Sequence, residues 1–325
     1  MSTNEPPTAL AVIEIPTVTL AVPQPASQNP AVVYLATLGA SSRRTMGGAL
    51  DKMAAILTGG RETRETLQWG QLRASHTLAL RARLADEMNA ATANRHLAAL
   101  RGVLKAAWRL EQMSGEDYAR AIDVKGVKGE TLPRGRSLDK NERVAISGAC
   151  AADAHPITGT RDAALLGVLY GTGVRRSEAV ALDLSDFDAR AGKLTVKHGK
   201  GNKAREVFMG RATVEALDAW LRLRGDAPGP LFLAVTKGHG IEAGRRLTAE
   251  GVRFILGQRA AQAGVAACSP HDLRRSFVSD LLDKGADIST VSKMAGHANL
   301  ATTQRYDKRG DLAKRAAAEL LDMAG

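Results

Sequence analysis

The stretch Gly171-Thr172-Gly173-Val174-Arg175-Arg176-Ser177-Glu178 decides how the second half of this 325-residue chain is interpreted. The apolar residues before it, 161–170, predict a helix, and the glycines predict its end. An arginine held directly after such a turn can present its N–H donors to an oxyanion, because a guanidinium stays charged at any working pH. The alternative is that Arg175 only forms an ion pair with Glu178, one helical turn later.

Five later positions carry residue types that suit phosphate chemistry. Lys200 stands between glycines at the expected tip of a β-hairpin, where its ammonium group can protonate a leaving oxygen. His271 and Arg274 are three residues apart, so they share one face of a helix. His297 follows a glycine, and Tyr306 comes shortly after it.

Each of these residues also has an ordinary explanation. Tyrosine has a solution pKa of about 10 and is a poor nucleophile without cations and a base beside it. An isolated lysine in a turn is normally solvated, and an isolated histidine is normally a cap or a core residue. Two arginines together match the two non-bridging oxygens of a phosphodiester, and they can stabilise the charge of its transition state. The set therefore suits covalent cleavage of a phosphodiester without a metal.

The order of these residues, with their flanking glycines, resembles the tyrosine recombinase (phage integrase) family. The matching stretches are 171–182, 197–207, 269–277 and 295–306, and residues 91–101 resemble the family's core-binding domain. The sequence departs from the family pattern at Met294-Ala295-Gly296-His297, where Leu-Gly-His is commoner, and at its N-terminal tail.

The resemblance implies a DNA strand-exchange enzyme that acts through a 3′-phosphotyrosyl bond, with neither ATP nor a cofactor or metal. It implies that the catalytic residues are Arg175, Lys200, His271, Arg274, His297 and the nucleophile Tyr306. It also implies a two-domain clamp around a double-stranded recombination site, and a homotetramer that holds two duplexes. An accessory DNA-binding protein is a further expected partner.

Composition agrees with a nucleic-acid partner. The net charge is +11 and the pI is near 9.9, which is typical of proteins that bind polyanions, although arginines on exposed helix faces would give the same balance. Cys150 and Cys268 form no disulfide or metal framework, and we expect both to be reduced and buried in a cytoplasmic protein. No apolar run approaches the roughly 20 residues of a membrane span. The first basic residue is Arg43, so we expect no signal peptide.

We expect a mainly α fold with a small antiparallel β-sheet (α+β), divided into four segments. They are a flexible, Pro-rich, acidic tail (1–29), a helical core-binding domain (30–124), a linker (125–136) and a catalytic domain (137–325) with a C-terminal exchange helix.

In the helical domain, Ser41 or Ser42 is the expected cap of a helix that ends before Gly59. Two apolar patterns predict further helices, one through Trp69, Leu72, Leu78, Leu80 and Leu84 and one through Leu97, Leu100, Leu104 and Trp108.

In the catalytic domain, a capping box of Asp139 and Glu142 predicts a helix to about Ala152. Alternating residues at 193–197 and 205–209 predict the hairpin. Further helices are expected at 161–170, 211–224, 248–263, 271–284, 287–295 and 311–323. The apolar stripe of the last of these must bury against its own domain or, as the resemblance implies, against a neighbouring protomer.

Candidate DNA-binding residues are basic or polar side chains of the helical domain, the linker and the surroundings of the catalytic set. They are Arg43, Arg44, Thr92, Asn94, Arg95, Arg101, Lys105, Lys125, Arg134, Arg136, Lys203 and Arg275.

Several alternatives stay open. A type IB topoisomerase or a telomere resolvase would use the same catalytic residues, and a DNA-binding protein without activity is a different class. Among recombinases, the ending Tyr306-Asp307-Lys308-Arg309-Gly310-Asp311 resembles that of integrases and transposon resolvases encoded by mobile elements. The acidic, Pro-rich tail points the same way. The alternative is an Xer-type recombinase that resolves chromosome dimers.

Overall fold

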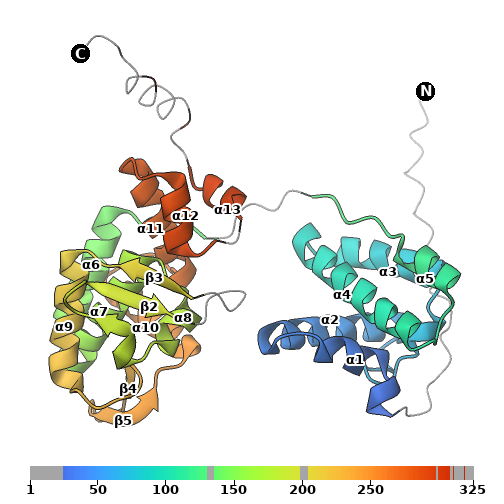
Figure 1. Ribbon diagram of the computed structural model, residues 1–325, viewed down its shortest axis with the longest axis horizontal. Helices are drawn as coiled ribbons and strands as arrows, with labels where there is room; N and C mark the ends of the chain where they lie inside the picture. Colours follow the sequence, from blue (N-terminus) through green and yellow to red (C-terminus); the bar gives the residue numbers. More distant parts are fainter. Residues whose placement is uncertain are drawn as a thin grey trace, which may run out of the picture. The chain divides into compact units, whose positions relative to one another are not determined.

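The structure is a computed structural model, and it describes residues 25–129, 135–197, 204–297, 299–307, 310 and 318. The chain forms two compact units, Met1–Pro133 (the N-terminal unit) and Arg134–Gly325 (the C-terminal unit). The predicted tail, the hairpin tip with Lys200 and the predicted helix at 311–323 lie outside the described residues, apart from residues 25–29 and 318. Both units are built mainly of helices, and the strands form small antiparallel sheets, as predicted (Figure 1).

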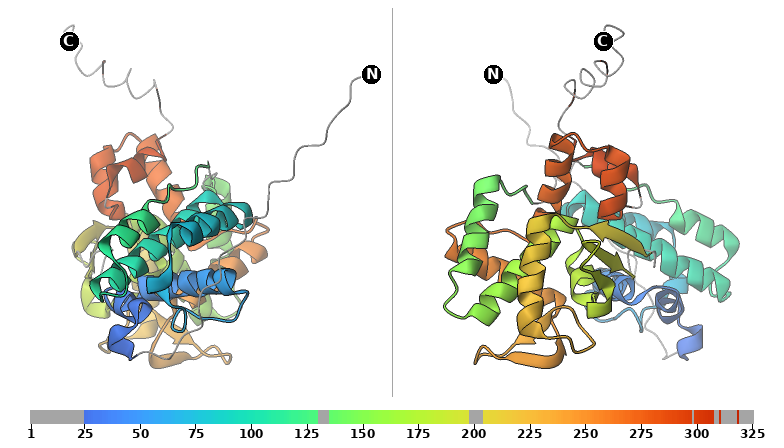
Figure 2. Two further views of the ribbon diagram at one scale, coloured as in Figure 1. Left: turned by 90° about the vertical axis from the view of Figure 1, so that its right-hand side faces the viewer. Right: turned by 60° about the vertical axis from the view of Figure 1, so that its left-hand side comes forward.

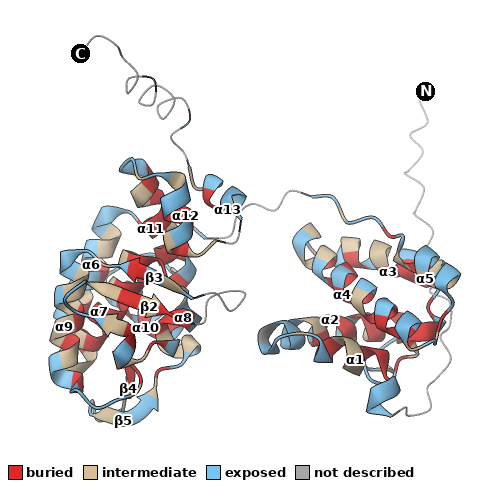
Figure 3. Cartoon of the chain, in the orientation of Figure 1, coloured by how far each residue is buried: buried red, intermediate tan, exposed pale blue. Residues whose placement is uncertain are grey.

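The described part of the N-terminal unit is all-helical. Its elements are η1 (Ala26–Gln28), α1 (Pro30–Ala36), α2 (Ala40–Thr58), η2 (Trp69–Gln71), α3 (Ala74–Glu87), α4 (Ala90–Arg109) and α5 (Gly115–Ile122). Their apolar faces form one core, with Leu50, Met53, Leu97 and Leu100 among its buried residues. Figure 3 shows this core as the red inner faces of helices whose outer faces are exposed.

The predicted cap of one helix was wrong. The helix α2 begins at Ala40 with Gly39 as its N-cap, so Ser41 and Ser42 lie inside its first turn; its end at Gly59, with a left-handed φ of 63°, is confirmed. Trp108 is 41% exposed and stacks on Tyr118, with 5.2 Å between the ring centroids. This indole therefore extends the apolar stripe of α4 beyond the buried core.

Leu78 is also exposed, unlike Leu80 and Leu84 of the same helix. Residues two apart on a helix point to opposite sides. Leu78 therefore faces solvent because Leu80 and Leu84 face the core.

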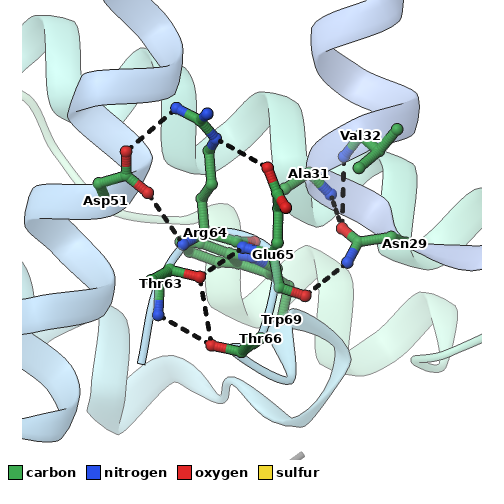
Figure 4. A network of polar contacts seen from close by, with 9 residues as sticks. All are labelled: Asn29, Ala31, Val32, Asp51, Thr63, Arg64, Glu65, Thr66 and Trp69. Atoms are coloured by element: carbon green, nitrogen blue, oxygen red, sulfur yellow. Dashed lines mark hydrogen bonds and ion pairs between the residues drawn. The ribbon is translucent and has the colours of Figure 1, made fainter. Parts of the chain in front are cut away.

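A polar network fastens the loop between α2 and η2 (Figure 4). The Asn29 side chain caps α1 by accepting two backbone N–H bonds, and its amide nitrogen donates to the Glu65 carbonyl at 2.6 Å. Asp51 accepts from the backbone and the side chain of Arg64, both at 3.0 Å. The Arg64 carbonyl accepts from the buried indole of Trp69 at 2.8 Å. The loop is therefore fixed by side chains of both neighbouring helices.

The first residues of the predicted linker are part of the N-terminal unit. The Asn94 side chain accepts from the Val127 N–H at 2.8 Å and donates to the Val127 carbonyl at 2.9 Å. Arg81 donates to the Lys125 carbonyl at 2.8 Å, and Arg101 donates to the Val124 carbonyl. These bonds hold residues 124–127 along α3 and α4.

The C-terminal unit contains helices and two antiparallel sheets. Its helices are α6 (Lys140–Ala151), α7 (Pro156–Thr172), α8 (Arg176–Ala181), η3 (Leu184–Asp186), α9 (Arg211–Arg224), α10 (Ala249–Gln262), α11 (Pro270–Asp283), α12 (Ile288–Ala295) and α13 (Leu300–Gln304). Its strands are β1 (Phe187–Asp188), β2 (Lys193–Val196), β3 (Arg205–Phe208), β4 (Leu233–Val235) and β5 (Ile241–Arg246). The sheets have the orders β1-β2-β3 and β4-β5, and Val196 pairs with Arg205.

Most of the predicted elements of this unit are confirmed. The helices α9 to α12 begin and end within one residue of the predicted positions, and β2 and β3 form the predicted hairpin. The capping box of Asp139 and Glu142 is present. The helix α7 begins earlier than predicted, at Pro156, because proline suits the first turn of a helix. The short helix α8 and the β4-β5 hairpin were not predicted.

Two hydrophobic clusters make up the core of the C-terminal unit. The larger one packs α6, α7, α9 and α10 against the sheets. The smaller one joins α11 and α12 through Phe277, Leu282 and Val291, and Tyr306 packs against it. The helices α11 to α13 thus gather at one end of the unit (Figures 1 and 2).

Cys150 is buried, as predicted, whereas Cys268 is only half-buried. Burial raises the pKa of both thiols, to about 11 for Cys150. No helix in the described ranges is both long and apolar enough to cross a membrane.

Candidate active site

The turn between α7 and α8 places Arg175. Gly173 ends α7 with a left-handed φ of 62°, and a Cβ atom there would lie 2.3 Å from the Phe277 ring. Only glycine therefore fits this turn. Arg175 becomes the N-cap of α8, where its N–H donates to Glu178 Oε2 at 2.9 Å and its Nη1 donates to Glu178 Oε1 at 2.8 Å. The ion pair considered from the sequence is thus present, and it orients Arg175.

Arg274 projects from α11 and is 4% exposed. Its Nη1 donates to the Gly173 carbonyl, whereas its buried Nη2 has no hydrogen-bond partner among the described residues. Burial first, and then the charge of Arg175, lowers the pKa of Arg274 to about 10. A buried donor without a partner costs free energy, so an acceptor that enters the site is bound favourably.

A second carbonyl ties Arg175 to the segment before His297. The Nη2 of Arg175 donates to the Gly296 carbonyl at 3.0 Å. Gly296 ends α12 with a left-handed φ of 64°, and the His297 N–H donates to Ser292 at 3.0 Å. Arg175 is therefore held by the Gly296 carbonyl, and Arg274 is held by the Gly173 carbonyl. Each arginine is fixed by the main chain of a segment distant in the sequence.

Thr303 connects His297 to Tyr306. Its buried hydroxyl lies 2.8 Å from His297 Nδ1, and its carbonyl accepts from the Tyr306 N–H at 2.9 Å. The two rings are nearly parallel, with an interplanar angle of 19° and 6.3 Å between centroids. The Arg275 guanidinium lies 5.3 Å from the Tyr306 ring centroid, on its face. The tyrosine is thus next to a histidine and a cation.

Both histidines are held in the neutral state near pH 7. Burial, followed by the charges of Arg274 and Arg175, lowers the pKa of His297 to about 4. His271, in the first turn of α11, is exposed at the surface, and partial burial with the charge of Arg274 lowers its pKa as well. A neutral imidazole has one ring nitrogen that can accept a proton, which is what a general base requires.

Asp272, between these residues in sequence, anchors α11. Its carboxylate accepts from the Ser269 N–H and hydroxyl, both at 2.8 Å, and from the Arg136 N–H at 2.9 Å. Gly135, with φ of 92°, leaves room for this approach, since a Cβ there would lie 2.2 Å from Asp272. The helix that carries His271 and Arg274 is therefore fixed to the chain entering the unit.

The structure brings together most of the predicted catalytic set. Besides burial, the charges of Arg274 and Arg175 lower the pKa of both His271 and His297. Arg175 and Tyr306 in turn act on the pKa of Arg274, in opposite directions. Lys200 lies outside the described residues. Among the residues that the structure describes, no cluster of three or more His, Cys, Asp or Glu side chains could hold a metal ion.

The candidate DNA-binding residues are placed differently from one another. On the surface of the N-terminal unit lie Arg43, Arg44, Arg95, Arg101, Lys105 and Lys125. Thr92 is half-buried, and Asn94 is occupied by Val127. In the C-terminal unit, Arg136 bonds Glu142 at 2.6 Å and Arg275 covers the Tyr306 ring. Arg134 and Lys203 lie outside the described residues.

Sequence reasoning missed three residues that shape the site. Arg205 donates two hydrogen bonds to the Glu178 carboxylate. Thr303 connects His297 to Tyr306, and Asp272 anchors α11. Asp272 had a local signal, since Ser269 and Asp272 have the spacing of a capping box. Arg205 contacts residues that are far from it in the sequence, and Thr303 contributes a single hydroxyl. No local sequence pattern marks either residue.

Residues 136–311, which hold this whole arrangement, match the Phage integrase family. The chain belongs to this family. It is similar to tyrosine recombinase XerC of Azotobacter vinelandii, with 39% identity over 222 residues, which cover 66% of this chain and 69% of the relative. It is also similar to tyrosine recombinase XerD of Mycobacterium leprae, with 39% identity over 225 residues, 67% of this chain and 70% of the relative.

Among solved structures, the integrase of transposon Tn1549 in complex with transposon right-end DNA has a TM-score of 0.68 to this chain. The match covers 92% of this chain and 99% of the solved integrase fragment, at 15% identity, so it shows the shared fold. Family membership makes the protein a tyrosine recombinase, an enzyme of DNA strand exchange.

Proposed function

We propose that the protein is a site-specific recombinase that cuts one strand of a duplex through Tyr306 and rejoins it to a strand of a partner duplex. The observation that carries this proposal is the buried Nη2 of Arg274, which has no hydrogen-bond partner among the described residues. It belongs to the same cluster of charges as Arg175, His297 and Tyr306. A phosphodiester oxygen is the ligand that such a donor pair fits.

In this reaction the Tyr306 hydroxyl oxygen attacks the phosphorus, and the bond from phosphorus to the 5′ oxygen breaks. The Tyr306 proton goes to a base at the site, for which the neutral His271 and His297 are the candidates. Lys200 supplies the proton that the 5′ oxygen takes up. Arg175 and Arg274 hold the non-bridging oxygens and stabilise the added negative charge.

The 5′-hydroxyl of the partner duplex then attacks the 3′-phosphotyrosyl bond and reverses the step. One phosphoester replaces another, so the bond energy is retained and neither ATP nor a metal ion is required. This chemistry needs duplex DNA held beside Tyr306. We propose that the N-terminal unit covers one face of the duplex with the exposed basic side chains of α4, among them Arg95, Arg101 and Lys105.

A nicked suicide duplex tests the proposal. The nick lies close to the cleavage site, so the short fragment that carries the 5′-hydroxyl diffuses away and the covalent protein–DNA adduct is trapped. Wild-type protein is expected to form a slow-migrating band that protease removes. Tyr306→Phe is expected to bind the same duplex normally and to form no such band, since it lacks the nucleophilic oxygen.

Tyr118→Phe is the matched control, because it removes a phenol from the N-terminal unit, where Tyr118 stacks on Trp108. It should form the adduct at the wild-type rate. An adduct that persists in Tyr306→Phe would place the nucleophile elsewhere. A wild-type protein that binds its site but never forms an adduct would favour a DNA-binding protein without activity.

For the biological role we propose recombination of a mobile element, as an integrase or a cointegrate resolvase. The Pro-rich, acidic residues 1–29 and the sequence after Tyr306 support this role. Chromosome dimer resolution is the second candidate, because the relatives reported above are XerC and XerD proteins. An inverted-repeat core beside the gene that recombines in vitro would support the first role, and a core at the chromosome terminus would support the second.

The proposed assembly is a homotetramer on two duplexes in the cytoplasm, with an accessory DNA-binding protein as a further partner. Strand exchange between two duplexes requires the cutting sites of several protomers in one complex. Light scattering on paired-site DNA should give the mass of four chains and two duplexes.

A further inference from the structure

Arg205, which opens β3, makes its contacts at the centre of the site. Its Nη1 and Nη2 donate to the two oxygens of Glu178, at 3.2 and 2.7 Å, and its Nε donates to the Met294 carbonyl at 3.2 Å. The side chain is only 13% exposed. A Cβ at Gly296 would lie 2.8 Å from Arg205 Cζ, so the glycine leaves the space that this guanidinium fills.

Glu178 is shared between two arginines. Its side chain is 3% exposed, and it also accepts from Arg175 Nη1 and from the Arg175 N–H. Burial alone would raise the pKa of Glu178, but the hydrogen bonds from Arg205 and from the Arg175 N–H outweigh burial and lower it. The carboxylate is therefore ionised, and the cluster of one carboxylate and two guanidiniums has a net charge of +1.

The net charge of this cluster determines how strongly Arg175 can attract a phosphate. A buried carboxylate with one arginine forms a neutral pair, and a neutral pair has little attraction for an anion. With Arg205 on both oxygens, the charge of Glu178 is already balanced. Arg175 then keeps a positive charge for the substrate, although it touches the same carboxylate.

We propose that Arg205 is a positioning residue for strand cleavage, which neutralises Glu178 so that the positive charge of Arg175 is available to the scissile phosphate. It acts through Glu178 and the Met294 carbonyl and need not touch DNA itself. This inference rests on the proposed function, because it assumes that Arg175 binds the phosphate.

The test compares single-turnover adduct formation on the nicked duplex at saturating DNA. Arg205→Gln should slow the adduct about 10²-fold, the effect of losing one donor to a transition-state oxyanion, with DNA affinity unchanged within about threefold. Arg205→Lys, which keeps the charge but loses the fork, should stay within about tenfold of wild type. The decisive variant is Arg205→Gln with Glu178→Gln, which removes the unbalanced carboxylate and should recover at least about tenfold over Arg205→Gln alone.

The matched control is the surface pair Arg211–Glu215, which has the same chemistry at 2.7 Å on α9 and leaves Arg211 92% exposed. Arg211→Gln, alone or with Glu215→Gln, should cleave at the wild-type rate. A merely structural role for Arg205 predicts that the second substitution adds to the damage, whereas charge balance predicts recovery.

The rates and the folding of the single and double variants together test the role of Arg205. Cleavage by Arg205→Gln at the wild-type rate, or a double variant no faster than the single one, overturns the inference. If the single variant is unfolded by circular dichroism but the double variant folds and cleaves, the uncompensated Glu178 charge is the cause and the inference stands. If the double variant is unfolded as well, Arg205 is a stability residue and the inference fails. Absence of an adduct from wild type would refute the proposed function itself.

Discussion

His297 should make the stability of the C-terminal unit depend on pH in a defined window. Burial and the neighbouring arginines hold its pKa at about 4, against 6.5 for an ordinary histidine. Between these two values the unfolded chain binds a proton on His297 that the folded chain does not bind. The free energy of unfolding should therefore fall as the pH falls from 6.5 to 4.

The size of the effect follows from the shift. One pKa unit corresponds to about 1.4 kcal/mol, so the full shift of His297 is worth about 3 kcal/mol once both states are protonated. At pH 5 the unfolded state is almost fully protonated and the folded state is not, which gives about 2 kcal/mol relative to pH 7.5. Solvent screening of the partly exposed ring makes this an upper value.

Fluorine NMR with 5-fluorotryptophan measures this unit separately. Trp220 belongs to the C-terminal unit, whereas Trp69 and Trp108 belong to the N-terminal unit. The Trp220 signal therefore reports the unfolding of the C-terminal unit alone. Urea titrations at pH 7.5 and 5.0 give the free energy of unfolding for wild type and His297→Gln. Wild type should lose about 2 kcal/mol more than the variant between the two pH values.

The comparison removes the contributions of all other groups, because both proteins share them. Equal losses within about 0.5 kcal/mol would show that His297 is protonated normally in the folded state. The same result would remove the basis for treating it as a neutral proton-transfer group. A direct titration of the His297 ring protons, with a midpoint above pH 6, would contradict the lowered pKa in the same way.

Other predictions address the turn, the general acid and DNA binding. Gly173→Ala should destabilise the C-terminal unit by roughly 1–3 kcal/mol in the same urea assay, since it combines a left-handed φ with contact against Phe277. A 5′-bridging phosphorothioate, whose sulfur leaves without a proton, should restore adduct formation to Lys200→Ala but not to Arg175→Ala or Arg274→Ala; equal rescue of all three would exclude Lys200 as the acid. Adduct formation should persist in EDTA, and a loss that Mg²⁺ restores would disprove the metal-free mechanism. Site affinity should fall steeply with salt, with a log–log slope near −7 for about 8 phosphate contacts, and a slope near −2 would argue against a clamp.

Local signals account for what the sequence predicted well. The capping box at Asp139, the glycine at the end of α2 and the alternation in β2 and β3 each act within a few residues, so they can be read in order along the chain. The helices α9 to α12 followed from apolar spacing in the same way. Arg175, Lys200 and His297 stood out because each lies beside a glycine that predicts a turn. His271 and Arg274 stood out by their helical spacing instead.

The missed features depend on contacts between distant segments. The strand β5 contains glycine and arginines with little preference for strands, and its pairing with β4 holds it. Arg205 looks like any basic residue of a hairpin until the fold brings Glu178 and Met294 to it. Ser41 has good capping chemistry, yet the helix starts before it because Gly39 takes the extended backbone that ends the preceding turn.

The reliance of the site on carbonyl oxygens has a consequence for sequence variation. Arg274, Arg175 and Arg205 donate to the carbonyls of Gly173, Gly296 and Met294. Every amino acid has the same main-chain carbonyl. Substitutions that keep the backbone conformation therefore keep these hydrogen bonds, whatever the side chain. None of these three contacts uses Ala295, the residue that stands where leucine is common in the family's Leu-Gly-His pattern. Homologues should therefore tolerate most apolar residues at position 294, but only glycine at 173 and 296.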